Sequence, residues 1–184
     1  STPDFFPLQV MNTILGGSFT SRLNQNLREN KGYTYGAGSG FSMRQEAGPF
    51  TARAEIVAAK SDAALVEFMK EIRGIGEAVP EEELAKTKRF LQLQLPSQFE
   101  TTEDIAMGLV PVALYGLPLD YYDSYAQKIG AVTREDVQRV ARTYLDAGRM
   151  AVVIVGDRKS IEDGIRAVNL GPVEFRDLAG ETVP

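Results

Sequence analysis

The stretch from Leu15 to Ala37, LGGSFTSRLNQNLRENKGYTYGA, restricts the fold more than any other part of the sequence. Apolar residues at helical spacing precede two adjacent glycines, Gly16 and Gly17, and such glycines signal the end of a helix. One of the hydroxyl residues that follow can cap a second helix, and Gly32 ends that helix. The sequence therefore predicts two helices in close succession before a strand.

The second of these helices has a simple pattern of apolar and polar positions. Leu23 and Leu27 are four positions apart, so they share one helix face and are predicted to be buried. Arg22, Gln25 and Asn26 lie off that face when it is counted at the α-helical period. We therefore expect these three polar side chains to be exposed.

From Tyr33 the pattern changes to a period of two, which is typical of a strand. Tyr33, Tyr35 and Ala37 are predicted to lie on one face, while the glycines within residues 36–40 occupy the other. A face without side chains lets another backbone or a ligand come close. Residues 49–59 alternate as well, so the two strands are predicted to form an antiparallel hairpin.

Helical patterns fill most of the chain after the hairpin. Pro111 is predicted to break the helix that begins near Thr102 into two or three short pieces. Met150–Val155 is a nearly continuous apolar run between glycines, which predicts a central strand buried on both faces. The order of elements predicts an α+β fold in which an antiparallel β-sheet has helices packed on one face. Residues 1–184 are predicted to form a single domain, with a terminal arm at roughly 171–184.

Composition excludes several classes of function. Histidine and cysteine are both absent, so the chain can form neither an H-x-x-E-H zinc site nor a Ser-His-Asp or Cys-His catalytic group. The net charge of −5 argues against bulk binding of nucleic acid, which requires a basic surface. No apolar run approaches the roughly 20 residues of a membrane span. We expect a soluble protein, and the sequence leaves its compartment open between the bacterial periplasm and the cytoplasm.

Two further motifs have structural explanations. The acidic clusters Glu81–Glu83 and Glu103–Asp104 are the only candidates for a carboxylate site that binds a hard cation, but both lie where a helix begins and negative charge is favoured. The glycines between Gly36 and Gly40 have the composition of a phosphate loop, but they lie inside a strand pattern and no helix follows them. Neither a metal nor a cofactor is therefore predicted on this chain.

The opening stretch also resembles a known family. A helix that ends in Leu-Gly-Gly, a Ser-Arg-Leu helix, Leu27-Arg28, a glycine, and Tyr35 seven positions after the arginine are similar to the C-terminal half-domain of the pitrilysin/insulinase zinc metallopeptidases, the inverzincins. The segments PFTARAEI, VPEEELAKTK, VTREDVQRVARTYL and RMAVVIVGD follow in the family's order and spacing. The resemblance implies a fold like that of LuxS and the mitochondrial processing peptidase, the metallohydrolase fold.

In this family, paired homologous domains share one chamber; one domain carries H-x-x-E-H and the other contributes an arginine and a tyrosine. The resemblance therefore implies that Arg28 and Tyr35 contact a peptide substrate or its transition state in the assembled enzyme. It also implies that zinc lies on the partner domain and not on this chain. An exposed sheet edge invites pairing, so we expect a homologous H-x-x-E-H domain or subunit as the partner, or a second copy of this chain in a homodimer.

Two functions stay open at this point. The first is the non-catalytic half of a zinc metallopeptidase, inactive alone, whose Arg28 and Tyr35 bind substrate and stabilise an oxyanion. The second is a catalytically inert assembly subunit that resembles the core proteins of membrane complexes. For the two residues themselves, the alternative to a catalytic role is that Arg28 forms a surface ion pair and Tyr35 packs on Leu27. The sequence of the partner discriminates between them. The sequence of this chain decides neither whether that partner is on the same polypeptide nor which peptides are cut.

Overall fold

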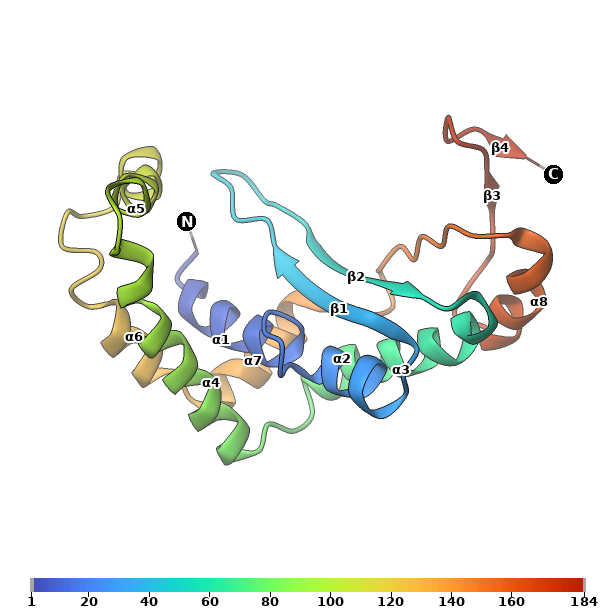
Figure 1. The fold of residues 1–184 in the computed structure, drawn as a ribbon, viewed down its shortest axis with the longest axis horizontal. Coiled ribbons are helices and arrows are strands. Elements are labelled where there is room, and N and C mark those ends of the chain that lie inside the picture. Colours follow the sequence, from blue (N-terminus) through green and yellow to red (C-terminus); the bar gives the residue numbers. More distant parts are fainter. Residues whose placement is uncertain (1, 184) are drawn as a thin grey trace.

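A computed structural model describes residues 2–183 as an elongated arrangement of helices around one antiparallel hairpin (Figure 1). Figure 1 places α5 at one end of the molecule and α8 with the short strands β3 and β4 at the other. The helices are α1 (Phe5–Leu15), α2 (Arg22–Asn24), the π-helix η1 (Gln25–Asn30), the 3-10 helices η2 (Ala58–Lys60) and η3 (Pro96–Phe99), α3 (Ser61–Gly74), α4 (Glu81–Gln94), α5 (Thr102–Tyr115), α6 (Tyr125–Ala131), α7 (Arg134–Tyr144) and α8 (Arg158–Val168), and the strands are β1 (Thr34–Phe41), β2 (Phe50–Ile56), β3 (Phe175–Arg176) and β4 (Thr182–Val183).

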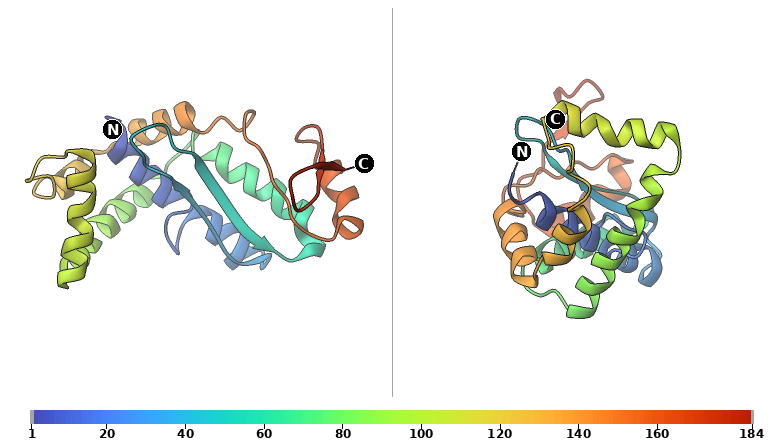
Figure 2. Two further views of the ribbon diagram at one scale, coloured as in Figure 1. Left: turned by 90° about the horizontal axis from the view of Figure 1, so that it is seen from above. Right: turned by 90° about the vertical axis from the view of Figure 1, so that its left-hand side faces the viewer.

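The predicted fold class is confirmed. β1 pairs antiparallel with β2, from Phe41 opposite Phe50 to Thr34 opposite Ile56. The further views show the hairpin lying across the helices, which cover one of its faces (Figure 2). β2 alternates as predicted, since Phe50, Ala52, Ala54 and Ile56 all pack against the core.

The core lies where α1 meets the helices and the hairpin around it. α1 contacts α4, α6 and α7, and it also contacts β1. Burying these apolar side chains supplies most of the favourable free energy of folding. The fully buried members are Val10, Met11, Leu15, Leu23, Leu27, Ile75, Ile129, Val137 and Val140.

The buried central strand predicted for Met150–Val155 is wrong. The segment connects α7 to α8 without helix or strand structure, and the side chains of Val153 and Val155 are 85% and 90% exposed. Among residues 2–183 the sheet has only the strands β1 and β2, so the segment has no strand beside it. An apolar run indicates a tendency to be buried, but it does not provide the neighbour that would bury it.

The predicted break in the helix at Pro111 is also wrong, because α5 is continuous across it. The helix is well defined at both ends. Thr101 and Asp104 form a capping box at its start, and Gly116 ends it with a φ of 61°. A proline removes one backbone hydrogen bond and strains one turn, and the other turns of this capped helix offset that cost. No helix in the described part of the chain, α5 included, is long and apolar enough to cross a membrane.

Candidate functional site

The two glycines after α1 bring the end of that helix against β1. The backbone oxygen of Gly16 accepts a hydrogen bond from the backbone N–H of Ser39, with an N···O distance of 3.1 Å. The Ser39 hydroxyl donates to Oδ1 of Asn12 at 2.8 Å. A Cβ atom on Gly16 would lie 2.5 Å from the Ser39 backbone nitrogen, which is inside the contact limit. Only glycine permits this approach, and it fixes where the following loop begins.

Asn24, which is 7% exposed, joins that loop to the strand. Its Nδ2 donates to the backbone oxygen of Phe19, and its Oδ1 accepts from the backbone N–H of Ala37, each at 2.9 Å. Because one carboxamide holds both segments, the position of Phe19 depends on the position of β1. Asparagine is a poor helix former, so its position in this helix between two buried leucines could have indicated a hydrogen-bonding role. The pattern of apolar and polar positions does not include that role.

The helix predicted after Ser21 contains a π-helical section, η1. Its wide hydrogen bonding is seen where the N–H of Lys31 donates to the oxygen of Asn26 at 3.0 Å. A π turn contains more residues than an α turn, which moves Asn26 to the inner face. Its Nδ2 donates to Glu67 at 2.9 Å and to Glu71 at 2.6 Å. The predicted exposure of Asn26 is therefore wrong.

The Asn26 contact also changes the acidity of a neighbouring side chain. The hydrogen bond from Asn26, with lesser contributions from Lys31 and Lys70, holds the pKa of the Glu67 carboxyl below its ordinary value of 4.5 against the opposing effect of desolvation. The hydrogen bond from Asn26 and the nearby lysine charges all favour the charged form of the Glu67 carboxyl. On the other side of the short helix, Arg22 forms a bidentate pair with Glu83 of α4, with N···O distances of 2.9 and 2.5 Å. These contacts fasten α2 to α4 and η1 to α3.

A β-bulge aims Tyr35 outward. Thr34 pairs with Ile56 and Ala37 pairs with Ala54, so Tyr35 and Gly36 together face one residue of β2. The Thr34 hydroxyl holds this bulge, since it donates to the oxygen of Gly36 at 2.8 Å and accepts from its N–H at 3.1 Å. Bulges commonly redirect a side chain next to a functional site.

The bulge corrects two expectations about Tyr35. The side chain is 95% exposed, whereas Ala37 is buried, so these residues do not share one face of a regular strand. Leu27 is fully buried, and a tyrosine as exposed as Tyr35 does not pack on it. The bulge depends on the two hydrogen bonds between the Thr34 hydroxyl and the backbone of Gly36. A sequence pattern of period two takes no account of such bonds, so it did not predict the bulge.

Arg28 lies in η1 and stacks on an aromatic ring. Its guanidinium carbon is 4.4 Å from the centroid of the Phe19 ring, and its Nε is 3.6 Å from the carboxylate of Glu29. The side chain is about one-third exposed. A guanidinium that stacks through its face keeps N–H groups at its edge for other acceptors. Phe19, which is 62% exposed, was not among the residues that sequence reasoning selected.

The turn at Gly32 links the two predicted site residues. Gly32 has a φ of 64°, and Tyr33 donates its N–H to the oxygen of Leu27 at 2.8 Å. The turn at Gly32 thus joins η1, which contains Arg28, to β1, which contains Tyr35. Within residues 2–183, no hydrogen bond or ion pair joins their side chains to each other.

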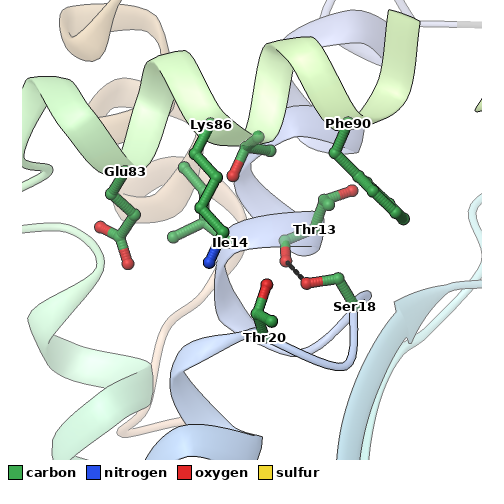
Figure 3. A pocket seen from close by; sticks show the side chains of 8 residues that line it. Thr13, Ile14, Ser18, Thr20, Glu83, Lys86 and Phe90 are labelled. Atoms are coloured by element: carbon green, nitrogen blue, oxygen red, sulfur yellow. Dashed lines mark hydrogen bonds between the residues drawn. The ribbon is translucent and has the colours of Figure 1, made fainter. Parts of the chain in front are cut away.

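The cavities near this turn are small or open. One pocket of about 60 Å³ lies between α1, the loop after it and α4, where Lys86 and Phe90 face Thr20 and Ser18 (Figure 3). It is too small for a peptide side chain and its neighbours, since ligand sites typically enclose at least about 300 Å³. An open groove of about 470 Å³ runs along η1 past Asn26. In the part of the chain that the structure describes, no three acidic side chains converge so as to hold a metal ion.

Sequence comparison identifies relatives of the first half of the chain. The family model described as the peptidase M16 inactive domain matches residues 1–91. An uncharacterized zinc protease of Rickettsia felis is 36% identical over 87 residues, which cover 47% of this chain and 21% of that protein. The chain therefore spans about a fifth of the length of this relative.

Structural comparison extends the likeness to most of the chain. The peptidase M16 inactive domain from Pseudomonas fluorescens matches with a TM-score of 0.71 and 30% identity, over 79% of this chain and 35% of that one. A chain of Complex III2 from Candida albicans matches with a TM-score of 0.65 and 19% identity, over 78% of this chain and 36% of that one. The second likeness concerns the fold alone.

The comparisons support the family resemblance that the motif from Leu15 to Tyr35 indicated, and they support the α+β architecture. The motif lies within the matched residues 1–91, and the structural match includes residues well beyond them, because it covers 79% of the chain. The chain is therefore a homologue of the inactive, C-terminal domain of the pitrilysin, or M16, family of zinc proteases.

Proposed function

We propose that this domain is the non-catalytic half of a zinc metallopeptidase and pairs with a homologous domain that carries H-x-x-E-H. In the assembled enzyme, Arg28 and Tyr35 bind the peptide substrate and donate hydrogen bonds to the oxygen that becomes negative during hydrolysis. The observation that carries this proposal is the orientation of Tyr35, whose ring is 95% exposed on a bulge held by Thr34.

The chemistry of the two side chains supports this role. A phenol supplies one O–H donor and a guanidinium supplies several N–H donors, and neither group is needed as an acceptor here. Donors that are already in place where negative charge develops stabilise the transition state without further reorganisation. Stacking on Phe19 restricts the Arg28 guanidinium while its N–H edge stays available. The stacking of Arg28 on Phe19 and the bulge that Thr34 holds beside Tyr35 therefore suit groups that must be oriented before substrate arrives.

Zinc does not fit the residues of this chain. Catalytic zinc sites use imidazole, thiolate and carboxylate ligands, and the sequence has neither histidine nor cysteine. In our proposal the metal is held by the partner domain and supplies the chemistry of peptide hydrolysis there. The contribution of this domain is limited to binding the substrate, orienting it and donating hydrogen bonds.

A catalytically inert assembly subunit is the alternative. The likeness to a chain of Complex III2 from Candida albicans supports it at the level of the fold, and the Arg28–Glu29 ion pair of 3.6 Å gives Arg28 a structural role. We favour the enzyme because the alternative leaves the Tyr35 ring without a function: its exposure means that the ring contributes little to the packing of this chain.

The test is to change each side chain in the assembled enzyme and to measure hydrolysis of a fluorogenic peptide. Tyr35→Phe keeps the ring and removes the donor, so turnover should fall by about 10²–10³ if the phenol stabilises the oxyanion. Arg28→Ala should lower kcat/KM by a comparable factor. Co-purification with the H-x-x-E-H partner confirms in each case that the two halves still assemble.

Matched controls lie close by. Tyr33→Phe alters a tyrosine whose ring packs against the core, and Arg89→Ala alters an exposed arginine of α4. Both variants should assemble and retain turnover. If Tyr35→Phe and Arg28→Ala assemble and turn over like these controls, the catalytic contribution is wrong. A natural partner that lacks H-x-x-E-H would favour the assembly subunit.

A further inference from the structure

The pocket between α1, the loop that follows it and α4 brings several hydrogen-bond donors together. It encloses about 60 Å³, which is several times the roughly 10–15 Å³ that a single water requires. Figure 3 shows the ammonium group of Lys86, from α4, and the hydroxyl of Thr20, from the loop, directed into the same space. The pocket therefore has room for a compact group of a few atoms among polar hydrogens.

The hydroxyl of Thr87 is a buried donor in the wall of this pocket. Thr87 is only 8% exposed and lines the pocket, and its hydroxyl makes no hydrogen bond with any group among residues 2–183. A threonine inside a helix can donate to the carbonyl four residues earlier, as Thr13 does to Gln9 at 2.8 Å. A buried hydroxyl without a partner costs free energy, so the pocket favours an occupant that accepts this proton.

The charge of Lys86 is not balanced by the acidic residue three positions before it. Glu83 lines the same pocket, but its two oxygens accept from Arg22 at 2.9 and 2.5 Å. No ion pair joins Lys86 to any acid among residues 2–183. The ammonium thus has three N–H donors beside a carboxylate whose charge Arg22 already compensates.

We propose that this pocket binds a small tetrahedral oxyanion, such as inorganic phosphate or sulfate, through Lys86, Thr87 and Thr20. This inference goes beyond the proposed function and does not depend on it. Hydrogen bonds from an ammonium to an anionic oxygen are among the stronger ones in proteins. The apolar side chains of Ile14 and Phe90 line the same pocket, and they strengthen the attraction by lowering the local dielectric. A water molecule can pair with the hydroxyls, but only an anion also balances the charge.

The occupant also restrains the loop after α1. Ser18 and Thr20 both line the pocket, and the Ser18 hydroxyl donates to the oxygen of Thr13 at 3.2 Å. Phe19 lies between these two residues and stacks on the guanidinium of Arg28. An oxyanion that accepts a hydrogen bond from Thr20 therefore fixes the loop that carries Phe19, and the backbone amides of residues 18–20 report its binding.

Isothermal titration calorimetry of the purified chain with sodium phosphate tests the proposal. At an ionic strength kept constant with sodium chloride, we expect one site with a Kd on the order of 1 mM. Sulfate should bind comparably, and acetate about tenfold more weakly, because a planar carboxylate offers two oxygens to donors that come from three directions. In NMR spectra the amide signals of residues 18–20 should shift during the phosphate titration with the same Kd.

Matched variants locate the site. Lys86→Met should weaken phosphate binding by about tenfold or more, whereas Lys88→Met removes the same charge from α4 outside the pocket and should bind like the native chain. Thr87→Val keeps the shape of the side chain and removes the donor, so it should weaken binding by about three- to tenfold. Thr13→Val is its control within the pocket, because the Thr13 proton is already donated to Gln9.

Three results would overturn the proposal. The first is the absence of saturable phosphate binding at concentrations about tenfold above the expected Kd. The second is equal weakening by Lys86→Met and Lys88→Met, since binding would then follow the net charge of the chain and not this pocket. The third is tighter binding of acetate than of phosphate, which would reject a tetrahedral ligand. Circular dichroism of each variant checks that the fold is intact.

Discussion

Replacement of Asn24 by alanine should loosen the connection between the Phe19 loop and β1. The Asn24 carboxamide makes two hydrogen bonds of 2.9 Å, one to the backbone oxygen of Phe19 and one from the buried backbone N–H of Ala37. Alanine can replace neither. The substitution therefore leaves a buried donor without a partner, beside a carbonyl group that water can reach in part.

The expected loss follows from these two bonds. An unpaired buried donor costs about 1–3 kcal/mol, and an ordinary hydrogen bond that water replaces contributes about 0.5–1.5 kcal/mol. We therefore expect Asn24→Ala to lower the free energy of unfolding by about 2–4 kcal/mol. For a chain of this length the corresponding fall in Tm is roughly 4–16 °C. This is a large share of the stability of a typical domain.

Urea unfolding of the purified chain measures the loss, and hydrogen exchange of the Ala37 amide locates it. The m-value should stay constant if only stability changes, and the amide of Ala37 should exchange faster in the variant. Asn30→Ala is the matched control, because Asn30 is exposed at the end of η1 and surface changes usually alter stability by less than about 0.5 kcal/mol. A loss for Asn24→Ala within that range, together with an Ala37 amide that stays protected, would refute the reasoning.

Two further predictions concern the surroundings of the site. Gly16→Ala should cost about 1–3 kcal/mol of stability in urea unfolding, because its Cβ would meet the Ser39 backbone nitrogen at 2.5 Å; Gly40→Ala, which has open space, should cost less, and equal costs would contradict the close approach. The Glu67 carboxyl has a folded pKa below its ordinary 4.5, chiefly through Asn26, so its contribution to stability is present above that value and is lost as the pH falls below it. Asn26→Ala should flatten the fall in stability between roughly pH 5 and pH 3, and an unchanged slope in urea unfolding at several pH values would contradict it.

The sequence predicted those features that neighbouring residues determine. The end of α1 at Gly16 and the turn at Gly32 follow from residues a few positions apart, whose hydrogen bonds and φ preferences act locally. The alternation of residues 50–56 fixed which face of β2 meets the core. The motif from Leu15 to Tyr35 was sufficient to indicate the family.

The sequence did not predict features that depend on distant partners. Asn26 is buried because Glu67 and Glu71, more than forty positions away, accept its hydrogen bonds and the π turn delivers it to them. Tyr35 points outward because the bulge adds a residue to β1 relative to β2. A sequence pattern read at a fixed helical or strand period includes neither the π turn nor the bulge. The predicted surroundings of Asn26 and Tyr35 were therefore wrong.

The segment Met150–Val155 shows the same division between local and tertiary causes. Its β-branched and apolar residues determine by themselves that the segment favours an extended, buried state. Whether it is buried depends on a neighbouring strand, and the sheet of residues 2–183 does not extend to it. Hydrophobicity is a property of the residues, but burial and backbone pairing are properties of two segments that meet, and only the tertiary structure decides which segments do.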